Sequence, residues 1–193
     1  MTDTLLEIKD LKVHFPIRSN QLFGGVTKYV KAVDGVSFHI EKGETLGLVG
    51  ESGSGKTTVG RSILRAIEPT DGKVTFNVDD ESFDLSQLTD KEMRVFRKHM
   101  QLIFQDPYSS LNPRMTVRDI IAEPLVAQNL ATGKEVDERV REAAGLCKLN
   151  LEYLRRFPHA FSGGQRQRIG IARALVSNPQ FIVCDDSVSA LDV

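Results

Sequence analysis

The sequence predicts an α/β fold in which helices pack on a largely parallel sheet and a helical subdomain is inserted into the core. Three observations lead to this prediction. Strand-like and helical segments alternate, a glycine-rich loop joins an expected strand to an expected helix at residues 50–57, and strand signals vanish between residues 106 and 161. With 193 residues, 40% of them apolar, the chain can bury one core, or a core and a small subdomain.

Apolar periodicity and turn residues place the elements of the first half. Strands are expected at residues 5–15, 30–40 (interrupted at Asp34 and Gly35), 44–49 and 73–78, the last at an edge. Residues 17–28 are expected to form an irregular loop, and a helix is expected at about residues 56–66. The acidic stretch after residue 78 is expected to be a loop before a short helix that starts with a Thr89–Glu92 capping box.

The second half is expected to be mostly helical between two buried strands, residues 100–104 and 181–184. Helices are predicted at residues 117–128, 135–146, 151–156 and 162–177. Thr116 can cap the first of these, and Pro124 is expected to kink or end it. Pro179 stops the last helix.

Charge and composition exclude several classes of protein. A net charge of −1, from 25 basic and 26 acidic residues, gives no electrostatic footprint for nucleic acid. Cys147 and Cys184 match no metal or redox spacing, which predicts a reduced cytosolic protein. The start of the chain is not a secretion signal, and no apolar run approaches the length of about 18 residues that spans a membrane. Any membrane association must therefore come through a partner.

Residues 50–57 match the phosphate-cradling pattern Gly-x4-Gly-Lys-Ser/Thr, between a strand and a helix as that pattern requires. Glycines let successive N–H groups point at phosphates, and the helix start adds partial positive charge. Lys56 is placed to reach the β- and γ-phosphates, and the Thr57 hydroxyl to bind Mg²⁺. The alternative is an ordinary Gly/Ser turn, and chance produces the pattern in about one chain per hundred or fewer. The candidate nucleotide-binding residues here are Gly50, Glu51, Ser52, Gly53, Ser54, Gly55, Lys56, Thr57 and Thr58.

Two carboxylates follow the strand expected at residues 181–184. Asp185 is placed as the second Mg²⁺-organising group, because a magnesium nucleotide needs such a carboxylate. An acidic residue after a strand often only caps a turn, so this interpretation depends on the phosphate loop. Asp186 could polarise the attacking water as a general base.

A second helix start directed at phosphate is predicted at residues 162–165. Ser162 and Gln165 can form a capping box. Gly163 and Gly164 are unfavourable at the first helical positions, since each costs about 0.5–1 kcal/mol relative to alanine. They are useful if this helix start must approach an anion closely.

Residues 161–168 and 183–192, together with the phosphate loop, resemble the ATP-binding cassette (ABC) transporter ATPases over nearly the whole chain. The resemblance implies a P-loop NTPase (RecA-like) parallel-sheet core with an antiparallel β edge and an inserted α-helical subdomain. It implies one domain, C-terminally incomplete, with its nucleotide-binding core at residues 1–105 and 162–193 and its helical subdomain at 106–161. ATP and Mg²⁺ are the implied ligands, and residues 162–165 of one subunit would contact ATP held by the other in a head-to-tail dimer.

The resemblance also implies roles for single residues. Gln105 looks like the glutamine that touches Mg²⁺ and links the site to the helical subdomain, although alone it would be read as a turn residue. An aromatic side chain should stack on adenine, with Tyr29 the first candidate and Phe23 the second. Residues 189–192 resemble the loop that signals between paired sites. The expected catalytic residues are Asp186, Gln105 and Lys56, and the expected metal ligands are Thr57, Gln105 and Asp185.

A narrower resemblance, in residues 32–38, 43–53 and 103–116, is to the ATPases of oligopeptide and dipeptide importers. It implies an energy-coupling ATPase, peripheral on the cytoplasmic face of the cell membrane and docked on transmembrane permease subunits. A second ATPase subunit would complete the dimer, and an extracytoplasmic binding protein would deliver peptides to the permease. No nucleic acid is expected as a partner. The rival is a DNA-repair or translation member of the same superfamily, and such proteins usually carry a long coiled-coil insertion or tandem cassettes, neither of which is seen in this sequence.

Two departures from the family pattern support an alternative. The family usually has Glu and then Pro where this chain has Asp186 and Ser187. The shorter side chain withdraws the carboxylate by about 1.5 Å, and a misplacement of ~1 Å can slow a reaction on the order of 100-fold. The family also continues past the position of Val193. The alternative is therefore a truncated nucleotide-binding subunit with little or no ATPase activity.

Overall fold

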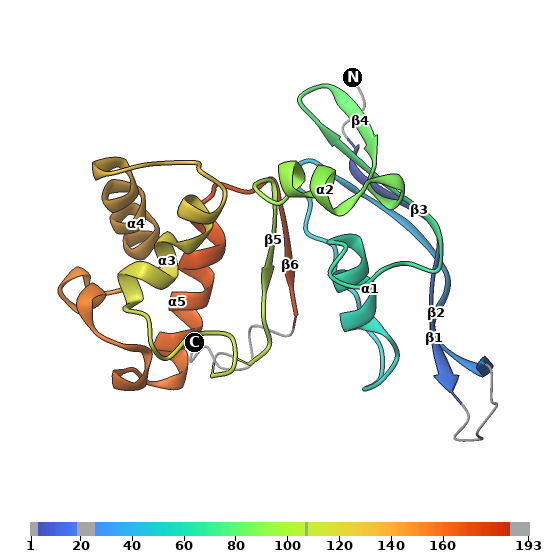
Figure 1. Cartoon of the computed structure of the whole chain (residues 1–193), viewed down its shortest axis with the longest axis horizontal. Coiled ribbons are helices and arrows are strands. Elements are labelled where there is room, and N and C mark those ends of the chain that lie inside the picture. The colour runs from blue at the N-terminus through green and yellow to red at the C-terminus, as the bar shows by residue number, and fades with distance from the viewer. Residues whose placement is uncertain (1–3, 19–25, 107, 186–193) are drawn as a thin grey trace. The chain divides into compact units, whose positions relative to one another are not determined.

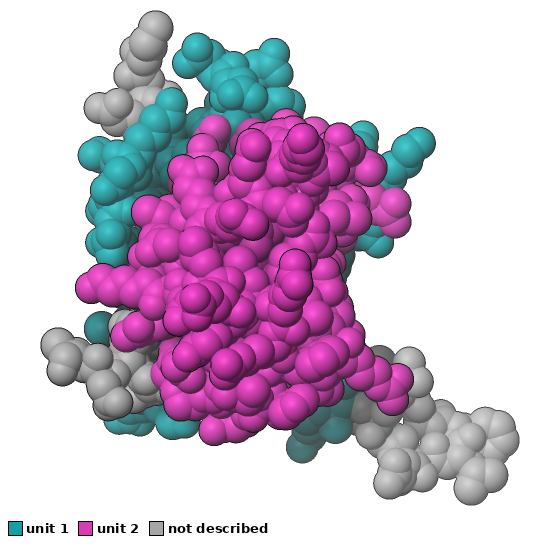
Figure 2. Space-filling view, turned by 90° about the vertical axis from the view of Figure 1, so that its left-hand side faces the viewer, with its two compact units in different colours: residues 1–93 teal, residues 94–193 magenta. Residues whose placement is uncertain are grey.

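The computed structural model describes residues 4–18, 26–106 and 108–185, and the chain divides into two compact units (Figures 1 and 2). Unit 1 comprises residues 1–93 and unit 2 residues 94–193. Strands β1 to β4 and helix α1 belong to unit 1, whereas β5, β6 and α3 to α5 belong to unit 2. Helix α2 (Asp90–Phe96) spans the boundary. The division predicted from the sequence, a helical subdomain at residues 106–161 within a core of residues 1–105 and 162–193, differs from these two units. It stays a prediction.

Unit 1 is built on an antiparallel four-stranded sheet in the order β2-β1-β3-β4. Its strands are β1 (Thr4–Arg18), β2 (Val26–Glu41), β3 (Asp71–Val78) and β4 (Glu81–Asp84). In β3, Val74, Phe76 and Val78 are buried while the residues between them are not, as the period of two requires when one face of a sheet is buried. This sheet confirms the expected antiparallel β part of the fold.

Several predicted features of unit 1 differ in the structure. The strand expected at an edge, β3, lies between β1 and β4, and both ends of the loop expected at residues 17–28 belong to strands, because β1 runs to Arg18 and β2 begins at Val26. Strand β2 continues through Asp34 and Gly35, where an interruption was expected, because the pairing with β1 absorbs several register shifts and Gly35 adopts a φ of +85°. The acidic stretch after Val78 is also not a loop, since it forms β4. Asp79 and Asp80 make its two-residue turn with φ values of +52° and +62°. Aspartate tolerates this left-handed region, and turns of this hand match the twist of the two strands.

The strand predicted at residues 44–49 is wrong: in the described chain, residues 44–50 carry no strand. Val49 is 91% exposed. An apolar run becomes a strand only where a neighbouring strand supplies backbone hydrogen-bond partners, and the sheet of unit 1 does not include this run. Helix α1 (Lys56–Ile63) follows the phosphate loop and ends earlier than expected, where Arg65 adopts a φ of +54°.

Unit 2 contains the expected parallel strands, β5 (Met100–Ile103) and β6 (Phe181–Cys184). They pair directly, from Met100 opposite Phe181 to Ile103 opposite Cys184. The helices α3 (Val117–Ala127), α4 (Lys134–Leu146) and α5 (Gly163–Leu175) confirm the predicted helical segments, with 3₁₀ turns at Leu151–Arg155 and Pro158–Ala160. No helix in the described residues is long and apolar enough to cross a membrane.

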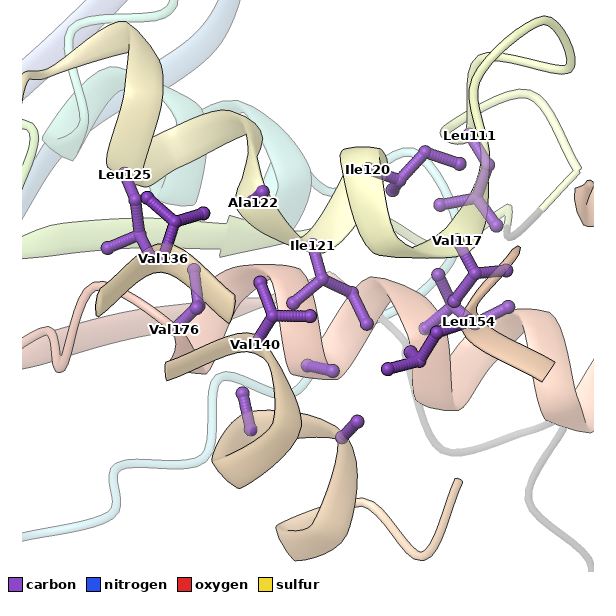
Figure 3. Close-up of a cluster of buried hydrophobic side chains, with 14 of the residues drawn as sticks. Leu111, Val117, Ile120, Ile121, Ala122, Leu125, Val136, Val140, Leu154 and Val176 are labelled. Carbon is purple, nitrogen blue, oxygen red and sulfur yellow. The ribbon is translucent and has the colours of Figure 1, made fainter. Parts of the chain in front are cut away.

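The core of unit 2 lies where α3, α4 and α5 meet (Figure 3). Apolar side chains three or four residues apart on each helix form it, the spacing that places them on one helical face. The fully buried members include Ile121 and Leu125 on α3, Val140 and Ala144 on α4, and Ile169 and Ala172 on α5.

Pro124 lies inside α3 and does not end it, since the helix runs to Ala127. Proline removes one helical hydrogen bond, but its ring is buried here and its carbonyl still accepts from the Gln128 amide. At the start of the helix, the Thr116 hydroxyl accepts from the Asp119 amide, which confirms the expected cap.

Candidate functional site

The phosphate loop, residues 50–57, leads directly into α1. The N-cap residue is Gly55, which has no side chain that could accept hydrogen bonds from the first-turn amides. The Lys56 ammonium bends back over the loop and donates to the carbonyl oxygens of Gly50 (2.8 Å) and Glu51 (2.7 Å). The positive charge of Lys56 is therefore held beside the backbone at the start of the loop. Backbone amides and one cation gathered in this way fit a chain of phosphates.

The backbone of a neighbouring strand requires glycine at position 55 of this loop, whereas the atom that a Cβ on Gly50 would meet, at 2.7 Å, is the Ser54 hydroxyl oxygen of a side chain. Gly55 adopts a φ of +94°, and a Cβ there would collide with the carbonyl oxygen of Ala32 on β2. Gly53 also has a positive φ, +82°, but no atom lies within 4 Å of its Cβ position. The two glycines thus have similar backbone conformations but different surroundings. The missing side chain of Gly55 lets the loop backbone contact β2, whereas the space beside Gly53 is open.

The loop packs against one face of the β1–β2 pair. The Cβ position of Gly55 is 3.6 Å from a Val33 methyl group, so the loop lies on the face to which Val33 points. Val33 pairs with Val13, and the register shift that follows puts the extra residue, Ala32, on β2, since His14 pairs with Lys31. Strand β1 therefore keeps its alternation, and Phe15, two residues after Val13, lies on the same face of β1. Phe15 is 42% exposed. It is therefore an aromatic side chain that a base could reach on the side of the phosphate loop.

Tyr29, the aromatic residue chosen from the sequence, lies on the opposite face. It pairs with Pro16, which follows Phe15 and points the other way. That second face also carries His14, whose Nε2 lies 2.9 Å from an Asp34 carboxylate oxygen. Tyr29 is 59% exposed. The alternation along β1 was the signal that could have drawn attention to Phe15, and the second aromatic candidate, Phe23, lies outside the described residues.

Two further candidate site residues, Gln105 and Asp185, follow the carboxyl ends of the parallel strands β5 and β6 in unit 2. Asp185 directly follows β6, and its amide donates to the Ile103 carbonyl oxygen at the end of β5 (3.0 Å). Gln105 follows two residues after Ile103 and is exposed. Because the carboxyl ends of parallel strands share an edge, the structure brings Gln105 and Asp185 to the same side of unit 2.

The start of α5 has the predicted capping box. The Ser162 hydroxyl accepts from the Gln165 amide, and the Gln165 side chain accepts from the Ser162 amide. The nearest atom to a Cβ on Gly163 would be the Tyr108 hydroxyl at 3.6 Å, an ordinary contact. Packing within this chain therefore does not demand glycine at position 163, and an incoming group remains the better explanation for it.

Thr57 and Thr58 lie in the first turn of α1, and Gly164 lies in the first turn of α5. The other predicted site residues are outside the described part of the chain. These are the expected general base, Asp186, and residues 189–192, which were expected to signal between paired sites. Their roles stay predictions.

Comparison with known proteins gives three findings. A family model described as ABC transporter matches residues 33–189. The chain is 56% identical over 194 residues to the oligopeptide transport ATP-binding protein OppF of Bacillus subtilis (strain 168). It is 52% identical over 192 residues to the oligopeptide transport ATP-binding protein AppF of the same strain. The alignments cover 100% and 99% of this chain but 60% and 57% of the relatives, so the chain spans somewhat more than half of their length.

Solved structures of ATP-binding cassettes are also similar. A dimeric post-hydrolysis state of the cassette MJ0796, bound to ADP and Pi, matches with a TM-score of 0.82 at 28% identity, covering 97% of this chain and 76% of that one. The cbiO1 protein from Clostridium perfringens matches with a TM-score of 0.74 at 24% identity, covering 99% and 68%. These matches confirm the predicted α/β fold class with a P-loop NTPase core.

Replacing Gly55 with alanine is expected to destabilise the protein more than replacing Gly53. Both changes place a side chain at a positive φ, which costs roughly 1–2 kcal/mol. Gly55→Ala adds a collision with the backbone of β2, so its total loss is expected to reach about 3 kcal/mol. Urea unfolding followed by circular dichroism measures the difference, and equal losses in the two variants would contradict the close approach of the loop to β2.

Gly163→Ala is expected to stabilise the fold and to weaken the recognition of an anion at the start of α5. The added methyl group fits, so removing glycine should raise the free energy of unfolding by about 0.5–1 kcal/mol. ATP-dependent dimerisation, measured by size-exclusion chromatography with light scattering, should decrease. Gly145→Ala on α4, whose Cβ position has no atom within 4 Å, is the matched control and should stabilise without changing dimerisation. Unchanged dimerisation of the Gly163 variant would refute the functional reading of this glycine.

Proposed function

The chain belongs to the ABC transporter family, as its sequence predicted, and from that membership we propose that it is the ATP-binding, energy-coupling subunit of a peptide importer. The observation that supports this most directly is the phosphate loop, whose glycines, helix start and inward-turned Lys56 suit a nucleoside triphosphate. Similarity over the whole chain to two oligopeptide transport ATP-binding proteins supports the substrate class.

The proposed reaction is hydrolysis of ATP, with each step assigned to a residue of this chain. Lys56 would leave the Gly50 and Glu51 carbonyl oxygens and bind the β- and γ-phosphates. Asp186 would accept a proton from the attacking water as general base. Because the carboxylate of aspartate reaches less far than that of glutamate, this step is expected to be slow.

Three residues with oxygen-containing side chains would hold Mg²⁺: Thr57, Gln105 and Asp185. Mg²⁺ prefers oxygen ligands and keeps phosphate and water oxygens in its coordination shell, so a few protein ligands suffice. When bound, the ion supplies positive charge that neutralises the charge developing on the phosphates. The edge that Gln105 and Asp185 share in unit 2 supports their joint role.

The subunit is proposed to act as a dimer on a permease. Residues 162–165 of one copy would contact ATP bound by the other, and the dimeric cassette MJ0796 is a similar protein that assembles in pairs. Residues 106–161 would form the helical subdomain, set into a core made of residues 1–105 and 162–193. Transmembrane permease subunits would hold the ATPase at the cytoplasmic face of the membrane, and a binding protein outside would deliver peptides.

A second candidate function is a nucleotide-binding subunit with little turnover. The observation that favours it is Asp186 in place of the glutamate that the family usually has. The hydrolysing role is preferred because a similar cassette was captured with ADP and Pi, the products of hydrolysis.

Lys56→Ala is expected to lower ATP affinity at least tenfold, because it removes the cation of the phosphate loop. Equilibrium dialysis with labelled ATP and Mg²⁺ measures the affinity of the purified chain. Lys42→Ala removes an exposed lysine ahead of the loop and is the matched control, expected to bind as the wild type does. Absence of ATP binding by the wild type would refute the proposed function, and equal binding by both variants would refute the role of Lys56.

Asp186→Glu is expected to raise the rate of ATP hydrolysis at least tenfold, because it restores the reach of the general base. Phosphate release under saturating ATP measures the rate. ATP affinity should stay within about twofold of the wild type, since the change affects the water and not the phosphates. An unchanged rate would contradict this account of Asp186.

Phe15→Ala is expected to weaken ATP binding about tenfold, in keeping with the roughly 1–3 kcal/mol that stacking of a base on an aromatic ring contributes. We propose that Phe15, and not the sequence-based candidate Tyr29, stacks on adenine, because Phe15 lies on the face of the phosphate loop. Phe15→Tyr should retain affinity, and Tyr29→Ala should change it less than twofold. Binding of tripolyphosphate, which has no base, should be unaffected in all three variants. A loss of ATP binding in Tyr29→Ala alone would reverse the assignment.

A further inference from the structure

Unit 2 contains a cavity that lies apart from the candidate nucleotide residues. Its volume is about 620 Å³, and all of its lining residues belong to this unit. They come from α4, from the end of α5 and from the short segments that lead into β5 and β6. Because His99 and Gln180 line the cavity and each directly precedes a strand, the cavity lies at the amino ends of the parallel pair. Gln105 and Asp185 follow the opposite, carboxyl ends.

Backbone and core contacts fix the lining of this cavity. The His99 carbonyl oxygen accepts from the amides of Gln180 and Phe181, both at 2.9 Å, and so holds together the segments that enter the two strands. Ala143 on α4 and Val176 at the end of α5 line the cavity and are buried members of the core cluster. The volume falls in the range of roughly 300–1,000 Å³ that small-molecule sites occupy, and a preformed lining spares a ligand the cost of ordering it.

Part of the lining is apolar and open to solvent. Leu146, the last residue of α4, lines the cavity and is 70% exposed. Leu130 and Leu175 also line it and are partly buried. An apolar side chain of a ligand that covered Leu146 would remove apolar surface from water, which is favourable. The cavity therefore suits a ligand with an apolar portion.

Two cations line the same cavity. Lys98 is partly buried, and within the described residues neither an ion pair nor a hydrogen bond engages its ammonium. Arg139 forms an ion pair through Nη2 with a Glu135 carboxylate oxygen at 2.8 Å, and a guanidinium has further N–H donors besides that one. A partly buried charge needs water or an opposite charge to compensate it. These two residues therefore suit a carboxylate.

Groups of the opposite sign also border the cavity. Glu142 lies three residues after Arg139, which places it on the same side of α4, and it is exposed. In the part of the chain that the structure describes, it pairs with neither Lys98 nor another cation. Helix α5 ends at Leu175, directly before the lining residues 176–178, and the last turn of a helix carries partial negative charge. These groups suit an ammonium.

Opposite charges beside one cavity select against ligands that carry a single charge. An anion would be attracted by Lys98 and Arg139 but would come close to the Glu142 carboxylate, and a cation would meet the reverse. An uncharged ligand would displace water from these charged groups without replacing its hydrogen bonds, which costs free energy. A ligand with both charges complements both sets of groups.

We propose that this cavity binds a small zwitterion with an apolar side chain, the chemistry of a free amino acid or a short peptide. Its carboxylate binds Lys98 and Arg139, its ammonium binds Glu142 and the end of α5, and its side chain packs on Leu146. The cavity and the candidate nucleotide residues of unit 2 lie at opposite ends of β5 and β6. The inference therefore does not rest on the proposed function.

Two-dimensional ¹H–¹⁵N NMR of the labelled chain, recorded without nucleotide while leucyl-leucine is added, tests the site. The amide signals of residues 142–146 and 175–178 should shift saturably, and those of residues 50–58 should stay unchanged. Leucine carries the same two charges and an apolar side chain, so the tighter binder of the two shows whether the site fits an amino acid or a peptide. Absence of saturable shifts with both ligands would overturn the inference.

Ligands that lack one group test each contact separately. N-acetyl-leucyl-leucine has no ammonium, leucyl-leucinamide has no carboxylate, and glycyl-glycine has both charges but no apolar side chain. Each should bind about tenfold more weakly than leucyl-leucine, since each lacks one of the three interactions. Equal binding of the N-acetyl ligand would make this a site for simple organic anions and would refute the zwitterion.

Variants of the two unpaired charges test the assigned contacts. Lys98→Gln and Glu142→Gln should each weaken the binding of leucyl-leucine about tenfold. Lys98→Gln should change the affinity for leucyl-leucinamide less than about twofold, because that ligand has no carboxylate to lose a partner. Lys134→Gln and Glu138→Gln remove exposed charges of α4 outside the cavity and should bind as the wild type does. Equal weakening of both ligands in Lys98→Gln would contradict the contact of Lys98 with the carboxylate.

Equilibrium dialysis with labelled ATP, on the same wild-type preparation, separates this inference from the proposed function. Binding of ATP without binding of leucine or leucyl-leucine would refute the cavity site alone. Binding of leucyl-leucine without binding of ATP would refute the proposed function alone. The two sites are expected to bind their ligands independently of each other's presence in the test.

Discussion

The burial of one face of α5 is the constraint on which unit 2 depends. Ile169 and Ala172 are fully buried in the apolar cluster with α3 and α4, and this packing sets the position of the helix. The short connection after α5 then leads into β6, which pairs with β5. Because the exposed start of the helix and the end that borders the cavity belong to the same rigid element, the packing that stabilises unit 2 also positions its candidate functional groups.

In unit 1, the contact between the phosphate loop and β2 places the loop on one face of the β1–β2 pair. The absence of a side chain at Gly55 lets the loop backbone reach the Ala32 carbonyl oxygen. This contact determines which face of the sheet lies beside the loop, and hence that Phe15 is on the loop side while Tyr29 is on the other. The requirement for glycine at position 55 therefore influences which aromatic side chain, Phe15 or Tyr29, can stack on the base of a bound nucleotide.

The predictions succeeded where the signal was local. The capping boxes at Thr89 and Ser162, the helices of unit 2 and the strands β5 and β6 follow from side-chain chemistry and periodicity within a few residues. The predictions were wrong where pairing with a neighbouring strand decides. Residues 44–49 have the composition of a buried strand but carry no strand, and the acidic stretch after Val78 forms β4 because β3 is its neighbour.

By itself, the sequence determined the chemistry available to this protein: the phosphate loop, the carboxylate after β6, the glycines at the start of α5 and the family to which the chain belongs. It could do so because each of these depends on residue types at fixed spacing. Only the tertiary structure decided which face Phe15 and Tyr29 occupy, that Gln105 and Asp185 share an edge, and that Lys98 and Glu142 line one cavity. These depend on strand register and on contacts between residues up to 82 positions apart, as between Ile103 and Asp185, for which no local pattern exists.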